Sequence, residues 1–155
     1  MIYVEAPAAL ERTTKPVLFL AGGITGCPDW QAGVLELLGA ADIVVANPRR
    51  ANFPIHDPGA AYEQIRWEFE LLRRADAVLF WFAGGPSLQP IALYELGAHA
   101  ANPAKRIAVG ADPGYARRPD VLIQLGLVRP GLTVHDDLGD VVADAVAHLD
   151  HAGLR

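Results

Sequence analysis

The 155-residue sequence lacks most of the features that mark secreted and membrane proteins. It holds one cysteine, Cys27, which excludes an internal disulfide framework and is typical of a reducing compartment. Residues 1–5 do not have the basic and then apolar layout of a signal peptide. No apolar run approaches the ~20 residues that span a bilayer. We therefore expect a soluble, cytoplasmic protein that does not associate with membranes.

Several classes of ligand are also disfavoured. The net charge of −5 argues against polymeric nucleic acid, which usually needs a basic face. The five histidines have no metal-ligand spacing such as H-E-x-x-H, so we expect no metal site. Neither G-x-G-x-x-G nor G-K-[ST] occurs, and we expect no cofactor. With 52% hydrophobic and 20% charged residues, the composition is that of a compact globular protein, and a small molecule is the expected partner.

Apolar runs alternate with helical patterns along the chain. The runs, which predict strands, are residues 17–21, 43–46, 77–82, 107–109 and, more weakly, 132–135. The patterns that predict helices are residues 29–39, 60–74, 90–101, 118–126 and 138–149. Continuous runs indicate strands covered on both faces, and the alternation indicates a parallel sheet. We predict an α/β fold, a flavodoxin-like (Rossmann-like) three-layer sandwich with five strands in the order 2-1-3-4-5. Residues 1–16 read as a poorly structured lead-in, and residues 17–155 as a single domain.

This fold also predicts where a ligand binds. Open α/β sheets bind ligands beyond the carboxyl ends of their strands, near the point where the strand order reverses. The segments that follow the first three predicted strands are residues 22–27, 47–59 and 83–89. The second is the longest, and loops of that length in compact domains are usually functional or mobile.

Glu95 is the strongest candidate for chemistry. Its helix, residues 90–101, is apolar nearly all round, and a helix of that kind is buried. A buried carboxylate without a partner is costly and shifts its pKa. Glu95 also falls in the second turn after a predicted strand, near the expected ligand edge. The alternative is a structural carboxylate that pairs with an arginine or reaches solvent.

Glu68 is the second candidate. It flanks the apolar stripe predicted on the helix 60–74, whose members are Ala61, Tyr62, Ile65, Phe69 and Leu72. Chemistry at glycosidic bonds commonly uses two carboxylates with different roles, which gives a second glutamate near Glu95 significance. The alternative is a surface ion pair with a nearby arginine.

The segment after the first predicted strand can approach a ligand closely. Gly22 and Gly23 permit a sharp turn before Ile24, and the alternative is a tight turn without a ligand. Trp30 and Gln31, in the helix that follows, can supply a stacking surface and amide donors for a base. Tryptophan alone is more often a core residue than a ligand contact.

The segment after the second predicted strand contains two adjacent arginines. Arg49 and Arg50 follow Asn47 and can hold a carbonyl, hydroxyl or phosphate through forked donors. Phe53 in the same loop can stack on a base. The alternative is that both arginines are ordinary solvated charges.

The ordered set of motifs resembles the nucleoside 2-deoxyribosyltransferase superfamily, in particular its short deoxyribosyltransferase-like branch. The resemblance covers about residues 17–118. The matching segments are Phe19-Leu20-Ala21-Gly22-Gly23-Ile24, Asp29-Trp30-Gln31, Asn47-Pro48-Arg49-Arg50, Gln64-Ile65-Arg66-Trp67-Glu68, Ala75-Asp76 and Pro90-Ile91-Ala92-Leu93-Tyr94-Glu95-Leu96-Gly97.

The resemblance implies a flavodoxin-like fold and roles for particular residues. Glu95 is implied as the nucleophile at the anomeric carbon and Glu68 as the acidic residue that assists. Homo-oligomers whose sites are completed by a neighbouring subunit are also implied. The chain departs from the pattern at Phe19, where the transferases have tyrosine, at Gln89, where they have aspartate, and at Glu68, which replaces an aspartate. The substrate-binding residues we expect are Gly22, Gly23, Ile24, Asp29, Trp30, Gln31, Asn47, Arg49, Arg50, Phe53 and Gln89.

We therefore expect an enzyme that acts on the N-glycosidic bond of a nucleoside or nucleotide. The first hypothesis is 2-deoxyribosyl transfer between bases through a glycosyl-Glu95 intermediate. The second is hydrolysis of a (deoxy)nucleoside 5′-monophosphate, with Arg49 or Arg50 binding the phosphate. The third is a non-catalytic nucleotide-binding or sensing domain of the same fold.

Overall fold

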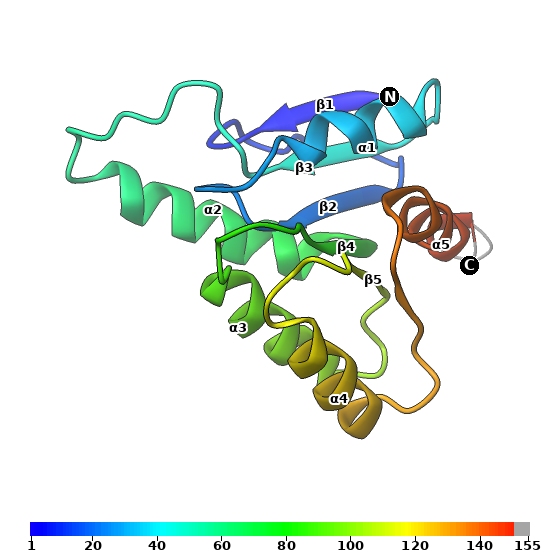
Figure 1. Ribbon diagram of the computed structural model, residues 1–155. Helices are drawn as coiled ribbons and strands as arrows, with labels where there is room; N and C mark the ends of the chain where they lie inside the picture. Colours follow the sequence, from blue (N-terminus) through cyan, green and yellow to red (C-terminus); the bar gives the residue numbers. More distant parts are fainter. Residues whose placement is uncertain (151–155) are drawn as a thin grey trace.

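The apolar runs form a parallel sheet in the computed structural model, which describes residues 1–150 (Figure 1). The strands are β1 (Ile2–Glu5), β2 (Val17–Gly22), β3 (Val44–Asn47), β4 (Ala77–Phe82), β5 (Ile107–Ala111) and β6 (Val134–His135). Their order across the sheet is β1-β3-β2-β4-β5-β6, with every neighbouring pair parallel. The last five residues of the predicted domain, 151–155, lie outside the described residues.

The five predicted strands are β2 to β6, and their order corresponds to the predicted 2-1-3-4-5. The prediction of only five strands is wrong, because residues 2–5 form a sixth. Strand β1 pairs with β3, with Ile2 opposite Val44, in a segment expected to lack regular structure. The side chains of Ile2 and Tyr3 are 45% and 43% exposed. A strand at the edge of a sheet needs no continuous apolar run, and its mixed polarity therefore gave no signal.

Four helices connect successive strands from β2 to β6, and a fifth follows β6. They are α1 (Trp30–Leu38), α2 (Ala60–Arg74), α3 (Pro90–Ala100), α4 (Arg118–Val128) and α5 (Leu138–Asp150), within two residues of the predicted bounds. Asp29 caps α1 by accepting a hydrogen bond from the backbone N–H of Ala32 at 3.2 Å. Gly39 ends the same helix with a φ of 52°. Among residues 1–150, no helix combines the length and apolar character needed to cross a membrane.

The helices cover both faces of the sheet, and the strands alternate between two cores. In β2, Phe19 packs towards α2 and α3, whereas Leu18 and Leu20 pack towards α1 and α5. Helix α4 joins α2 and α3 on their face (Figure 1). The three-layer sandwich predicted from the sequence is confirmed. It places the starts of α2 and α3 at the carboxyl edge of β3 and β4.

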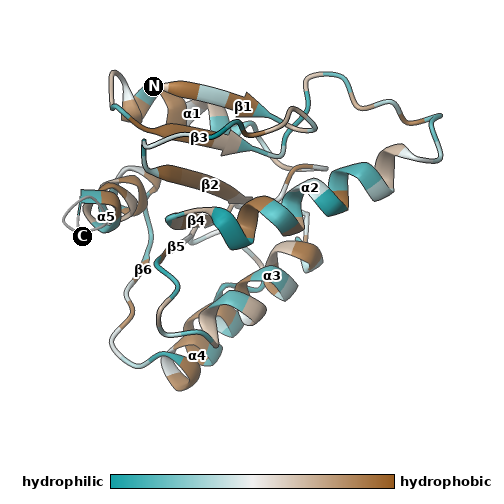
Figure 2. Cartoon of the chain, turned by 180° about the vertical axis from the view of Figure 1, so that it is seen from behind, coloured by the Kyte–Doolittle hydropathy of each residue, from teal (hydrophilic) through white to brown (hydrophobic). Residues whose placement is uncertain are grey.

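Two predicted apolar faces do not pack as expected. Helix α3 buries only Ala92, Leu96 and Ala100, and Tyr94 is 77% exposed, so the expectation of an all-round buried helix is wrong. On α2, Leu72 is buried, but the other four members of the predicted stripe are exposed. These helices show both hydrophobic and hydrophilic bands (Figure 2). Four of their exposed apolar side chains, Ile65, Phe69, Ile91 and Tyr94, border a cavity.

Candidate functional site

A cavity of about 910 Å³ lies between α2 and α3, next to the end of β2. Its lining draws on the loops that follow β2, β3 and β4 and on one side of each of the two helices. Six sequence-predicted site residues lie in that lining: Gly22, Gly23, Ile24, Glu68, Gln89 and Glu95. The cavity therefore occupies the carboxyl edge of the sheet, at the reversal of strand order where such folds bind ligands.

Glu95 lies on the flank of α3, beside the buried stripe that contains Ala92 and Leu96. Its carboxyl group is partly buried and faces the cavity lining. Within residues 1–150, no group forms a hydrogen bond or ion pair with it, and no arginine neutralises it. Burial raises the pKa of the Glu95 carboxyl to about 7, and the negative charge of Glu68 adds to the rise.

Glu68 reaches the same cavity from α2. Burial raises the pKa of its carboxyl, and a hydrogen bond from Gln64 opposes that rise. The Nε2 atom of Gln64 donates to Glu68 Oε1 at 2.7 Å and to the carbonyl of Pro48 at 2.8 Å. A carbonyl can only accept, so Pro48 fixes the orientation of the Gln64 amide and makes it a donor to Glu68.

Two carboxyl groups in one largely apolar cavity can share a proton near neutral pH. When two such groups interact, their protons leave in steps that belong to the pair. One ionised and one protonated carboxyl provide a nucleophile or charge stabiliser together with a proton donor. That is the combination that chemistry at a glycosidic carbon requires.

The walls of the cavity are mostly apolar. Phe19 lies at its base, 1% exposed, with its ring centroid 5.9 Å from that of Trp67. Ile65 and Phe69 of α2 face Tyr94 of α3 in the lining. Sequence reasoning assigned these side chains to buried stripes and so missed their place beside the cavity. The available signal was their spacing, because Ile65 and Phe69 flank Glu68 on the same side of one helix.

Two basic side chains also line the cavity, and sequence reasoning did not select them. Arg73 follows Glu68 along α2, with its guanidinium carbon 5.3 Å from the centroid of the Phe69 ring. His99 lies one turn after Glu95 on α3, and burial lowers the pKa of its imidazole. It forms no hydrogen bond with Glu95 among the described residues.

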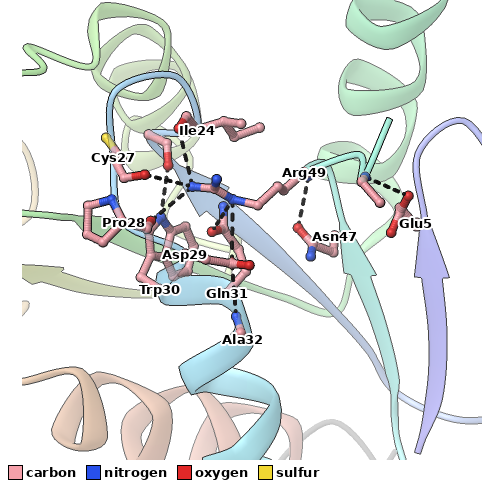
Figure 3. A network of polar contacts seen from close by, with 12 residues as sticks. Glu5, Ile24, Cys27, Pro28, Asp29, Trp30, Gln31, Ala32, Asn47 and Arg49 are labelled. Atoms are coloured by element: carbon pink, nitrogen blue, oxygen red, sulfur yellow. Dashed lines mark hydrogen bonds and ion pairs between the residues drawn. The ribbon is translucent and has the colours of Figure 1, made fainter. Parts of the chain in front are cut away.

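Arg49 does not line the cavity; it holds the loop that does (Figure 3). Its guanidinium donates to the carbonyls of Pro28, Ile24 and Cys27 at 2.9, 3.2 and 3.4 Å. Its Nε atom donates to Gln31 Oε1 at 2.8 Å. The donors of this side chain are therefore directed at the protein, between the end of β3 and the segment after β2.

The remaining predicted residues surround the cavity without lining it. Asn47 is buried between the Tyr3 hydroxyl, to which it donates at 3.0 Å, and the backbone N–H of Arg49. Arg50 lies 3.4 Å from Glu63 and over the ring of Phe53. Those outside the lining are Asp29, Trp30, Gln31, Asn47, Arg49, Arg50 and Phe53.

The two glycines after β2 are required by close packing. A Cβ atom on Gly22 would lie 2.3 Å from the carbonyl oxygen of Trp81 and 2.6 Å from the Trp30 ring. On Gly23 it would lie 2.3 Å from the Cys27 sulfur. The indole N–H of Trp30 donates to the carbonyl of Gly23 at 2.9 Å. Close packing therefore requires both glycines, whose backbone forms part of the cavity wall, and the turn that the sequence predicted here lies later, at residues 25–26.

No group of three His, Cys, Asp or Glu side chains is placed to hold a metal ion anywhere in residues 1–150.

A family model described as nucleoside 2-deoxyribosyltransferase like matches residues 15–115, which include β2 to β5, α1 to α3 and every residue of the cavity lining. No curated protein matches the chain.

Proposed function

The chain belongs to the nucleoside 2-deoxyribosyltransferase-like family, and we propose that it transfers a 2-deoxyribosyl group from one base to another with Glu95 as the nucleophile. The observation that carries this proposal is the Glu95 carboxyl, partly buried in an apolar cavity beside Glu68 and free of any arginine. Family membership supports chemistry on a nucleoside, and the carboxyl pair supports chemistry at its glycosidic carbon.

The proposed reaction has two displacement steps. In the first, an oxygen of Glu95 forms a bond to C1′ while the bond from C1′ to the base nitrogen breaks. The electron pair of that bond stays on the nitrogen, which takes a proton from Glu68. In the second, a ring nitrogen of the acceptor base attacks C1′, gives its proton back to Glu68 and releases Glu95.

At rest the pair holds its proton on Glu95, whose pKa is about 7 beside the charged Glu68, so the proposed reaction begins when that proton passes to Glu68. Burial of an unpaired carboxylate makes it a stronger nucleophile than a solvated one, because it is stabilised less. The Gln64 amide occupies one oxygen of Glu68 and leaves the other to carry the transferred proton. The raised pKa of each carboxyl keeps one proton on the pair close to neutral pH.

The positions of Arg49 and Arg50 support an uncharged nucleoside rather than a 5′-monophosphate as the substrate. The nucleotide hypothesis assigned the phosphate to Arg49 or Arg50, and neither arginine lines the cavity. Arg49 donates to loop carbonyls, and Arg50 is paired with Glu63. Hydrolysis of a nucleotide and binding without turnover are the alternative outcomes of the test below. The cytoplasmic location and the lack of a cofactor stay predictions.

We propose that a second copy of the chain covers the open side of the cavity. Five large apolar side chains along α2 and α3 are more than half exposed: Ile65, Phe69, Ile91 and Tyr94, which line the cavity, and Tyr62, which lies outside the lining on α2. Apolar area of this kind on a soluble protein marks an interaction surface. A symmetric pairing of α2 and α3 would bury these side chains and remove water from the carboxyl pair.

The test compares a 2′-deoxynucleoside with its 5′-monophosphate, each with and without a free acceptor base. Bases are separated by chromatography, and Glu95→Gln serves as the inactive reference. We expect the base of the deoxynucleoside to be exchanged, and only when the acceptor base is present. Free base released from the monophosphate without acceptor establishes the hydrolase instead. Full exchange by a folded Glu95→Gln variant would falsify the nucleophile assignment.

A further inference from the structure

Gln89 joins the two loops that form the cavity wall next to Glu95. Its side chain is 4% exposed. Its Oε1 atom accepts a hydrogen bond from the backbone N–H of Gly23 at 2.9 Å, and its Nε2 atom donates to the carbonyl of Ala83 at 2.8 Å. Gly23 follows β2 directly and Ala83 follows β4, its neighbour in the sheet. One side-chain amide therefore bridges the carboxyl ends of two adjacent strands.

The backbone of Gln89 is also unusual. With φ 49° and ψ 50°, it is the one non-glycine residue in the described part of the chain with a positive φ. Side-chain-bearing residues adopt this left-handed conformation only where their surroundings fix it. The Gln89 carbonyl accepts from the N–H of Leu93 at 3.2 Å, so the same residue begins α3. Gln89 therefore both bridges the two loops and begins the helix that contains Glu95.

The contact between Gln89 and Gly23 is as close as a glycine allows. A Cβ atom on Gly23 would lie 2.6 Å from both Cγ and Cδ of Gln89. The amide needs its acceptor and its donor at the same time, which a carboxylate cannot provide because it only accepts. Although Gln89 lines the cavity, its amide is directed at backbone groups of the protein.

We propose that Gln89 is a positioning residue that sets the placement of Glu95 relative to the loop after β2, and that it does not bind the sugar hydroxyls. This inference rests on the proposed transfer reaction. Glu95 lies in the second turn of the helix that begins at Gln89. The loop at Gly23 forms the wall against which a sugar would be held. A displacement of one against the other by ~1 Å can lower the rate about 100-fold.

Two substitutions separate the two hydrogen bonds. Gln89→Met keeps the length of the side chain and removes both bonds. Gln89→Glu keeps the acceptor for Gly23 and removes the donor to Ala83. Gln124→Met, on the exposed side of α4, is the matched control for a glutamine-to-methionine change.

The kinetic test uses a 2′-deoxynucleoside and its 2′,3′- and 2′,5′-dideoxy analogues. Gln89→Met is expected to lower kcat roughly 10- to 100-fold, by the same factor for all three substrates, with KM changed less than about threefold. Gln89→Glu, which retains the bond to Gly23, is expected to lower kcat by a smaller but equally uniform factor. If Gln89→Met and the wild type have nearly the same kcat for an analogue that lacks one hydroxyl, Gln89 binds that hydroxyl and the proposal is wrong.

A second measurement does not depend on turnover. Hydrogen exchange of the Gly23 amide is expected to be at least about 10-fold faster in Gln89→Met, because that N–H loses its acceptor. It is expected to stay slow in Gln89→Glu and in Gln124→Met. Unchanged Gly23 exchange in Gln89→Met overturns the positioning role. Absence of transfer by the wild-type protein, with Gly23 exchange as expected, overturns the proposed reaction and leaves the bridge intact.

Discussion

Glu68 raises the pKa of Glu95 through its negative charge, although the two residues belong to different helices. Helix α2 brings Glu68 to the cavity and α3 brings Glu95, so the pair exists only in the folded protein. Burial has the larger effect on the Glu95 carboxyl, and its pKa reaches about 7. A carboxyl in that position is useful for catalysis and costly for stability, and both consequences are measurable.

Glu95→Gln is expected to stabilise the protein above pH 7 while abolishing transfer. Between its ordinary pKa of 4.5 and the folded value of about 7, the unfolded chain releases the Glu95 proton and the folded protein keeps it. The stability of the wild type therefore falls as pH rises through this window, and the glutamine variant lacks that loss. At about 1.4 kcal/mol per pKa unit, the stability advantage of the variant grows by about 2–3 kcal/mol between pH 4.5 and 8. Denaturant unfolding across that range measures it.

Glu36→Gln is the control for the loss of one negative charge. Glu36 is exposed on α1, on the other face of the sheet, and forms no ion pair among the described residues. Its substitution is expected to leave the pH dependence of stability unchanged. A Glu95→Gln advantage that is flat between pH 4.5 and 8 would show that the Glu95 carboxyl titrates as a solvated group.

Glu68→Gln is expected to change the shape of the pH–rate profile. The proposed reactive form of the pair holds one proton, so wild-type kcat/KM declines above pH about 7, where the last proton leaves. The variant has no carboxyl to protonate the leaving base, and its rate is expected to fall about 10²- to 10⁴-fold. Removal of the Glu68 charge also lowers the pKa of Glu95. The alkaline decline therefore disappears, and the acid limb that remains reports the Glu95 carboxyl alone, with a pKa below 7.

The pH profile of transfer, measured with one deoxynucleoside from pH 4.5 to 9, checks this prediction. Glu70→Gln, on the exposed side of the same helix, is expected to keep the wild-type profile. An alkaline limb that persists unchanged in Glu68→Gln means that another group donates the proton.

Ile65→Arg is expected to dissociate the proposed oligomer. Ile65 is 65% exposed beside the cavity on α2, and a guanidinium there would be buried without a partner in the assembly. Sedimentation is expected to show a multimeric wild type and a largely monomeric variant, with transfer reduced in parallel. Leu37→Arg, at a residue 54% exposed on α1 across the sheet, is expected to sediment as the wild type does. A wild-type monomer contradicts the proposal.

The sequence predicted the layers of this fold because its strands are continuous apolar runs. Residues 77–82 are buried on both faces and match β4 at each end. Strand β1 was not predicted, because Ile2 and Tyr3 lie at a half-exposed edge of the sheet. There the pairing with β3, and not an apolar run, makes the segment a strand. The register of such a strand depends on its neighbour, which residue pattern alone does not reveal.

The sequence predicted site residues whose type is unusual in its local setting. It did not predict the role of residues whose hydrogen-bond partners lie far away in the sequence. Glu95 is unusual on an apolar helix, and it lines the cavity. Helical spacing identified Ile65 as apolar, but it does not distinguish a core face from the wall of a cavity. Arg49 and Gln89 were predicted as ligand contacts, and the structure directs their donors at loop carbonyls. Such hydrogen bonds join segments distant in sequence, so only the folded arrangement reveals them.

Arg49→Lys is expected to destabilise the protein by about 1–2 kcal/mol, since partly buried acceptors lose a charged donor. A lysine ammonium keeps the charge, but its single nitrogen cannot contact the loop carbonyls and Gln31 together, as the Nη2 and Nε atoms of Arg49 do. The loop after β2 is expected to exchange its amide hydrogens faster, and denaturant unfolding gives the loss of stability. Arg66→Lys is the matched control, because Arg66 makes one exposed contact with Glu70. Exposed pairs of this kind contribute about 0–1 kcal/mol, so the control is expected to remain close to wild type. If the two substitutions cost the same, Arg49 does not hold the loop, and its guanidinium becomes available to a ligand phosphate.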